Sequence, residues 1–138
     1  MEYLGTIADF LFGWVLDANA EDYNIFCNTD VLAWVLIALV AISLCAVCIF
    51  YHGVSKVAAN ATRKNYRVIF VLGLLVLWLA NFILIPTIVD DWSYAFGFNN
   101  LFVSLIDTFY YACLYELFSF FVKEKSNAPH LILHNCIF

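Results

Sequence analysis

Residues 31–51 read VLAWVLIALVAISLCAVCIFY, a long apolar run without a charged side chain. Two further apolar runs follow at 68–89 (VIFVLGLLVLWLANFILIPTIV) and 101–122 (LFVSLIDTFYYACLYELFSFFV). A helix that rises about 1.5 Å per residue crosses the hydrocarbon core of a bilayer in about 20 residues. Each run therefore predicts one membrane-spanning helix, and the whole chain is predicted to be an all-α integral membrane protein.

The composition excludes a soluble globular domain. Of the 138 residues, 65% are hydrophobic and 12% are charged, whereas a soluble domain has about 25% charged residues. Residues 31–122 form the predicted transmembrane region, and residues 1–30 and 123–138 are too few for a second domain. A net charge of −5 gives no sign of a nucleic-acid partner. The expected partners are the lipid bilayer and other copies of the chain or other membrane subunits.

The charged residues lie on opposite sides of the predicted spans. All six basic residues fall on one side: Lys56, Arg63, Lys64, Arg67, Lys123 and Lys125. Eight of the eleven acidic residues fall on the other side, in residues 1–30 and at Asp90 and Asp91. Because basic residues are retained in the cytoplasm, the N-terminus is predicted outside and the C-terminus in the cytoplasm, in an inner membrane or its equivalent.

The segments between the spans also carry local signals. Apolar residues recur at helical spacing in residues 4–15, which predicts a short amphipathic helix lying on the outer face of the membrane. The stripe consists of Leu4, Ile7, Ala8, Leu11, Trp14 and Val15. The connection before Arg67 can extend a helix, and Pro86 is expected to kink or end the second span, because proline lacks a backbone donor.

The third span carries a hydroxyl-rich face, the polar stripe. At about 100° per residue, Thr108, Tyr111 and Tyr115 fall within about 40° of Ser104, and Asp107 lies about 60° to one side. A carboxylate near the centre of a bilayer costs about 2.5–3.5 kcal/mol to insert. Asp107 and Glu116 therefore require an explanation beyond anchoring.

Two explanations of these acids stay open. They can mark a path for ions or protons, or they can join helices through polar contacts. Glu116 can pair with a basic residue such as Lys123 of a neighbour. Asn81, in the second span, is expected to bond across helices to a partner such as Tyr111 or Glu116.

The first span offers a groove of small side chains at Ala38, Ala41, Cys45 and Cys48, where another helix can approach closely. Cys45 and Cys48 have the spacing of a metal or redox pair, but no clustered ligand accompanies them in the span. His130, His134 and Cys136 lack a fourth ligand. No metal, cofactor or catalytic residue is predicted, and the chain is expected not to be an enzyme.

Two functions follow from these features. The first is a small non-catalytic membrane subunit that assembles through its helices into a larger membrane complex. The alternative is a homo-oligomeric pore, an ion or proton channel lined by the third span. The three-span topology is similar to that of one class of phage holins, but the tail lacks their strongly basic composition, so the chain is not placed among them.

Overall fold

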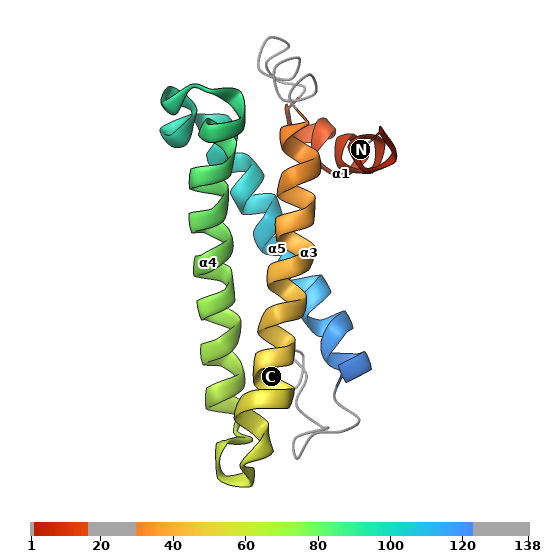
Figure 1. The fold of residues 1–138 in the computed structure, drawn as a ribbon, viewed down its shortest axis with the longest axis vertical. Helices are drawn as coiled ribbons and strands as arrows, with labels where there is room; N and C mark the ends of the chain where they lie inside the picture. Colours follow the sequence, from red (N-terminus) through yellow and green to blue (C-terminus); the bar gives the residue numbers. More distant parts are fainter. Residues whose placement is uncertain (1, 17–29, 123–138) are drawn as a thin grey trace. The chain divides into compact units, whose positions relative to one another are not determined.

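The structure, a computed structural model, describes residues 2–16 and 30–122, and its regular elements are helices (Figure 1). Its long elements are α1 (Glu2–Leu16), α3 (Val31–Cys48), α4 (Arg63–Val89) and α5 (Phe98–Val122). The described residues are 93% helical and include no strand. The prediction of an all-α chain is therefore confirmed over this part of the protein.

Three helical runs are long and apolar enough to cross a membrane. They comprise 26 residues at Val31–Lys56, 27 at Arg63–Val89 and 25 at Phe98–Val122. Large apolar side chains on their surface, such as Leu75 and Leu79 of α4, are 60% and 59% exposed. Such exposure suits contact with lipid, because a soluble protein rarely leaves a contiguous apolar surface of this kind open to water.

The connection after α3 continues as short helical turns. A π-helix spans Ile49–Gly53, and 3₁₀-helices span Val54–Lys56 and Ala58–Asn60. The hydroxyl of Ser55 donates to the carbonyl of Tyr51 at 2.8 Å. The expected helical extension thus takes the form of one π-helical turn and two short 3₁₀ turns rather than a regular α-helix. Helix α4 begins at Arg63, before the predicted start of the second span.

Pro86 does not end α4, which continues to Val89. The hydroxyl of Thr87 donates to the carbonyl of Ile83 at 2.6 Å. Asp90 then adopts a left-handed backbone conformation with φ of 57°, and the Asp91 amide donates to the Pro86 carbonyl at 3.1 Å. This is the hydrogen bond of a Schellman motif, so the helix ends at Val89, just before the left-handed Asp90, rather than at the proline.

The chain divides into two compact units. The first unit comprises Met1–Leu39 and Leu77–Thr108, and the second comprises Val40–Val76 and Phe109–Phe138. The core of the first unit is mostly aliphatic, with Val31, Val35 and Leu39 of α3 and Leu77 and Ile85 of α4 fully or almost fully buried.

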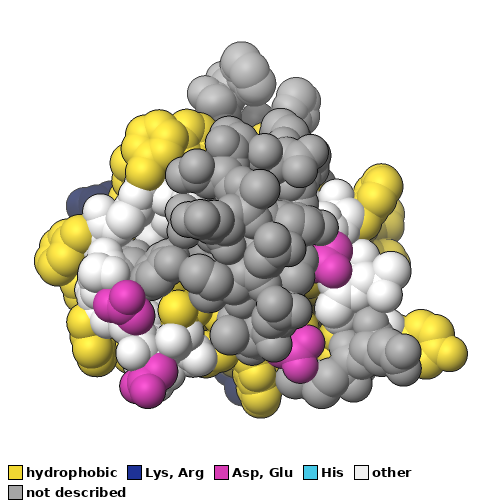
Figure 2. Space-filling view, turned by 90° about the horizontal axis from the view of Figure 1, so that it is seen from above, with side chains coloured by type: hydrophobic (Ala, Val, Ile, Leu, Met, Phe, Trp, Pro, Cys, Tyr) yellow, Lys and Arg dark blue, Asp and Glu magenta, His cyan; other side chains and the backbone are white. Residues whose placement is uncertain are grey.

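Helix α1 belongs to the first unit and lies beside the beginning of α3 (Figure 1). It buries Ala8 and Phe12, whereas Leu4 and Ile7 of the expected stripe are 38% and 51% exposed. The predicted helix is present, but part of its apolar stripe faces outward. On the face shown in Figure 2, separate acidic side chains are interspersed with hydrophobic ones.

The core of the second unit is aromatic. Its largest fully buried side chains are Phe50, Tyr51, Tyr66, Tyr111 and Tyr115. The ring of Tyr66 packs edge-on against Phe50 and Tyr115, with centroids 5.0 and 5.1 Å apart. Aromatic pairs favour this arrangement, so the unit is held by ring packing as well as by aliphatic contact.

Candidate functional site

Asn81 of α4 and Asp107 of α5 meet in the first unit. Both side chains are fully buried, and the Asn81 Nδ2 donates to Asp107 Oδ2 at 2.5 Å. The structure thus pairs Asn81 with Asp107 rather than with the expected Tyr111 or Glu116. The second oxygen of each side chain, Oδ1, has no hydrogen-bond partner within the described part of the chain.

Polar residues near this pair form a chain of hydrogen bonds that starts at Trp78 of α4 and continues along α5. Trp78 Nε1 donates to the hydroxyl of Thr108 at 3.0 Å, and Thr108 donates in turn to the carbonyl of Ser104 at 2.9 Å. Ser104 donates to Asn100 Oδ1 at 3.4 Å, and Asn100 Nδ2 donates to the carbonyl of Ala95 at 3.1 Å. Ser104 and Thr108 of the polar stripe therefore form their hydrogen bonds within the first unit.

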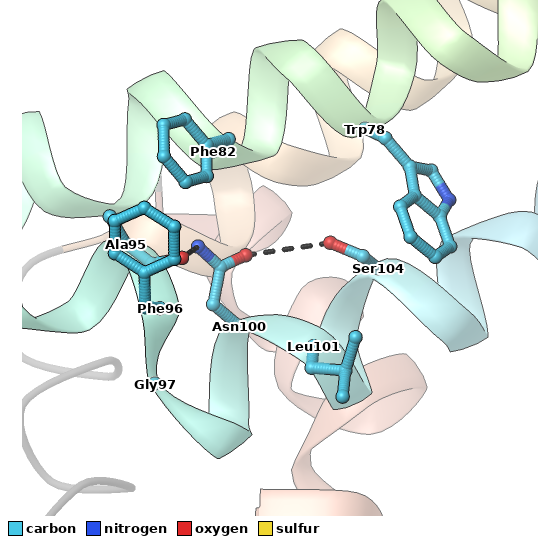
Figure 3. Close-up of a pocket in the computed structure, with 8 residues that line it drawn as sticks. All are labelled: Trp78, Phe82, Ala95, Phe96, Gly97, Asn100, Leu101 and Ser104. Atoms are coloured by element: carbon cyan, nitrogen blue, oxygen red, sulfur yellow. Dashed lines mark hydrogen bonds between the residues drawn. The ribbon is translucent and has the colours of Figure 1, made fainter.

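A pocket of about 300 Å³ lies next to these residues (Figure 3). Its walls include the rings of Trp78, Phe82 and Phe96, and the side chains of Asn100 and Ser104 also line it. The hydrogen bond between Asn100 and Ser104 runs along this lining (Figure 3). The pocket is mainly apolar and holds no arrangement of nucleophile and base.

In the second unit, tyrosines join α5 to α4. Tyr111 donates to the carbonyl of Phe70 at 3.2 Å and Tyr115 donates to that of Tyr66 at 3.4 Å. The hydroxyls of Tyr66 and Ser119 lie 3.0 Å apart. Tyr111 fits against the buried Gly73, where an added Cβ would collide with its hydroxyl and lie 3.1 Å from the Cβ of Ala46.

The second unit also has an apolar groove of about 410 Å³ between α3 and α4. Small side chains at Ala41, Cys45, Ala46 and Gly73 contribute to its lining. Larger aliphatic side chains complete it: Ile42, Ile49, Ile69, Leu72 and Val76. We call this surface the small-residue groove.

Two of the four residues of the predicted groove, Ala41 and Cys45, line this surface. Ala38 belongs to the first unit, and the half-buried Cys48 is not part of the lining. Ala46 and Gly73 also line the groove and were not among the predicted residues. The glycine within the second apolar run was the available signal, because glycine in a membrane helix permits a close approach.

The remaining predicted residues are placed differently. Glu116 is half-buried and makes no hydrogen bond or ion pair with the described residues. Lys123, His130, His134 and Cys136 lie outside the described residues. Within the described ranges, 2–16 and 30–122, no three His, Cys, Asp or Glu side chains form a group that could hold a metal ion.

The turn after α4 carries one perturbed acid. The Ser93 backbone amide donates to Asp91 Oδ1 at 2.8 Å. This hydrogen bond, reinforced by the Ser93 hydroxyl, lowers the pKa of Asp91 below its ordinary value, because it stabilises the charged form. Asp91 therefore supports the connection between α4 and α5.

Comparison of the chain with protein-family models, with curated proteins and with solved structures gives no match.

Proposed function

We propose that this chain is a small non-catalytic membrane subunit that crosses the bilayer three times and assembles with other membrane proteins. The placement of its basic residues supports an outside N-terminus and a cytoplasmic C-terminus. The small-residue groove of the second unit is the observation that carries this proposal.

The lining of the groove suits a helix better than a substrate. Ala41 and Cys45 are exposed, and their short side chains let a second helix backbone come close. No charged or amide side chain lines the groove, so it offers nothing that would orient a polar ligand. We assign it to a transmembrane helix of a partner subunit, packed through van der Waals contact.

The hydrogen bonds of the polar stripe favour assembly over the alternative function. In the first unit, Asp107 and Thr108 bond to α4. In the second unit, Tyr111 and Tyr115 bond to carbonyls of α4. A pore lined by the third helix would need these side chains to face an aqueous channel, whereas they are used here between helices of one chain.

The assembly proposal is tested by widening one side chain inside the groove and one outside it. Cys45 and Cys113 are both exposed thiols of the second unit, and only Cys45 lines the groove. We expect Cys45→Leu to lower the fraction of the chain that native mass spectrometry finds in a complex, because leucine fills the groove. Cys113→Leu should leave that fraction unchanged.

A parent chain that is monomeric in mild detergent would contradict the proposal. Equal behaviour of the two leucine variants would contradict the role of the groove. The orientation has its own test, since a cysteine at the exposed Val57 should resist an impermeant thiol reagent applied from outside. Labelling of that cysteine in intact cells would reverse the topology.

The pore alternative is tested by ion flux in liposomes. We expect an Asp107→Asn, Glu116→Gln double variant to conduct no differently from the parent chain, because neither acid serves a channel in the assembly proposal. A parent flux that the double variant abolishes would favour the pore.

A further inference from the structure

The pair of Asn81 and Asp107 has two acceptor oxygens left over. One amide hydrogen of Asn81 is donated to Asp107 Oδ2, while the Oδ1 atoms of both residues have no partner in the described chain. Both side chains are fully buried. A buried polar atom without a hydrogen bond is costly and needs a specific explanation.

The ionisation state of Asp107 decides whether these atoms can be satisfied. An ionised carboxylate and an amide oxygen are both acceptors only, so neither oxygen could donate a hydrogen bond to the other. A protonated carboxyl gains one O–H donor. We propose that Asn81 and Asp107 form a proton-binding site, in which the proton on Asp107 Oδ1 is donated to Asn81 Oδ1. The two side chains are then joined by two hydrogen bonds, one in each direction.

No basic side chain of the first unit can balance a charge on Asp107. Residues 1–39 and 77–108 contain no Lys, Arg or His anywhere in the sequence. An ionised Asp107 would therefore be a buried charge without a counter-ion from its own unit, which is strongly unfavourable. A proton removes that charge and supplies the missing donor at the same time.

The number of free oxygens favours a proton over a metal ion. Hard cations such as Ca²⁺ take about 6–8 oxygen ligands, whereas this site has two unused oxygens. A single proton needs one donor atom and one acceptor atom, which the pair provides.

The pocket in Figure 3 is lined by sequence neighbours of the pair on both helices, and neither Asn81 nor Asp107 is part of its lining. Ser104 lines it one helical turn before Asp107, and Trp78 and Phe82 line it on either side of Asn81 in the sequence. Solvent that enters the pocket reaches Ser104, which precedes Asp107 by three residues on α5. We therefore expect the proton to exchange with solvent deuterons without unfolding of the chain.

Infrared spectroscopy of the intact chain in lipid at neutral pH tests the site directly. A protonated carboxyl has a carbonyl band above the carboxylate bands, and we expect this band to shift in D₂O. Carboxyl-¹³C labelling of aspartate should move it as well, without any substitution. Asp107→Asn should remove the band, and Glu116→Gln, which changes the other acid of α5, should keep it.

Two infrared results would overturn the proposal. One is a spectrum without a protonated-carboxyl band. The other is a band that ¹³C-aspartate leaves in place and that only Glu116→Gln removes, because the proton would then reside on Glu116.

Thermal unfolding gives a second, independent measure. In Asp107→Asn, the new amide can donate to Asn81 Oδ1 and accept from Asn81 Nδ2, so we expect the Tm to stay within a few degrees of the parent. Asp107→Leu removes both bonds and should lower it clearly. A lower Tm when Na⁺ is replaced by choline, together with an absent protonated-carboxyl band, would show that the site binds a metal ion instead of a proton. The site can hold its proton whether or not the chain assembles with partners.

Discussion

The same two helices, α4 and α5, are joined by different chemistry in the two units. In the first unit an amide meets a carboxyl between mainly aliphatic side chains. In the second unit tyrosine hydroxyls reach backbone carbonyls across an aromatic core. The tyrosine hydroxyls bond to backbone carbonyls within α4, which as helix carbonyls also accept intrahelical hydrogen bonds. The amide and the carboxyl, in contrast, are each other's hydrogen-bond partners. The first unit should therefore be more sensitive to loss of a polar group, and the second more sensitive to a change of shape.

The largest effect is expected from a change of shape in the second unit. A methyl group at Gly73 would collide with the Tyr111 hydroxyl and crowd Ala46. We expect Gly73→Ala to lower the free energy of unfolding by about 1–3 kcal/mol, as overpacking of a core does. Denaturant unfolding in detergent measures it.

The control is Gly53→Ala, because an added Cβ at Gly53 meets no atom within 4 Å. Its effect should stay within about 0.5 kcal/mol. Removing the Tyr111 hydroxyl should also soften the Gly73→Ala defect, so the double variant Gly73→Ala, Tyr111→Phe should lose less than the sum. Full additivity would contradict the close contact.

The next effect is expected from loss of the amide in the first unit. Asn81→Ala leaves the buried Asp107 without the hydrogen bond from Asn81. A cost of about 1–2 kcal/mol is expected from a buried polar group that loses its partner in a membrane. Asn65→Ala serves as the comparison, because Asn65 makes a bond to the Asn60 carbonyl that is open to solvent. If Asn65→Ala proved as costly as Asn81→Ala, the contrast between the units would fail.

A smaller effect is expected from a hydroxyl of the second unit. Tyr66→Phe removes the bond to Ser119 but keeps the ring that packs against Phe50 and Tyr115. The expected loss is about 0.5–1 kcal/mol, typical of one hydrogen bond. Adding Ser119→Ala to Tyr66→Phe should lower the free energy of unfolding little further, since both substitutions break the same bond. A large additional loss would mean that the two hydroxyls have separate roles.

The smallest effect is expected in the turn between α4 and α5. The hydrogen bond from Ser93 lowers the pKa of Asp91. The stabilisation from this hydrogen bond is therefore present at pH values above the ordinary pKa of an aspartate. It is lost as the pH falls through the lowered pKa of Asp91. The protection factor of the Ser93 amide, its intrinsic exchange rate divided by its observed rate at the same pH, should therefore fall in acid.

Asp91→Asn should remove this acid dependence of Ser93 exchange. Asp90→Asn should preserve it, because asparagine tolerates the left-handed conformation found at Asp90. Identical pH profiles in the two variants would show that Asp91 does not hold the turn.

The fold was largely predictable, because long apolar runs depend only on local sequence. The three apolar helices and the helix at the N-terminus follow from such runs. The course of α4 past Pro86 was not predicted, because the Thr87 hydroxyl bond and the Schellman motif at Asp90 depend on local geometry that hydropathy does not record. The π-helical turn at Ile49–Gly53 had no clear signal in the sequence.

The candidate sites were predictable only in part. The sequence placed Asp107 beside a polar stripe and small residues on the first span, both from helical periodicity. Asn81 was expected to bond to Tyr111 or Glu116. Periodicity gives the helix face on which a residue lies, but it does not give which residues of two packed helices lie at the same height. Two of the four predicted groove residues, Ala41 and Cys45, line the groove.

The sequence by itself determined that this chain has three helices long and apolar enough to cross a membrane, since hydrophobicity and length are properties of each segment alone. The tertiary structure decided which polar groups meet. Asn81 with Asp107, and Tyr111 against Gly73, are distant in the sequence and come together through the packing of α4 and α5 within each unit. A hydrogen bond requires its two atoms at one place, and only the packing of the helices sets that place.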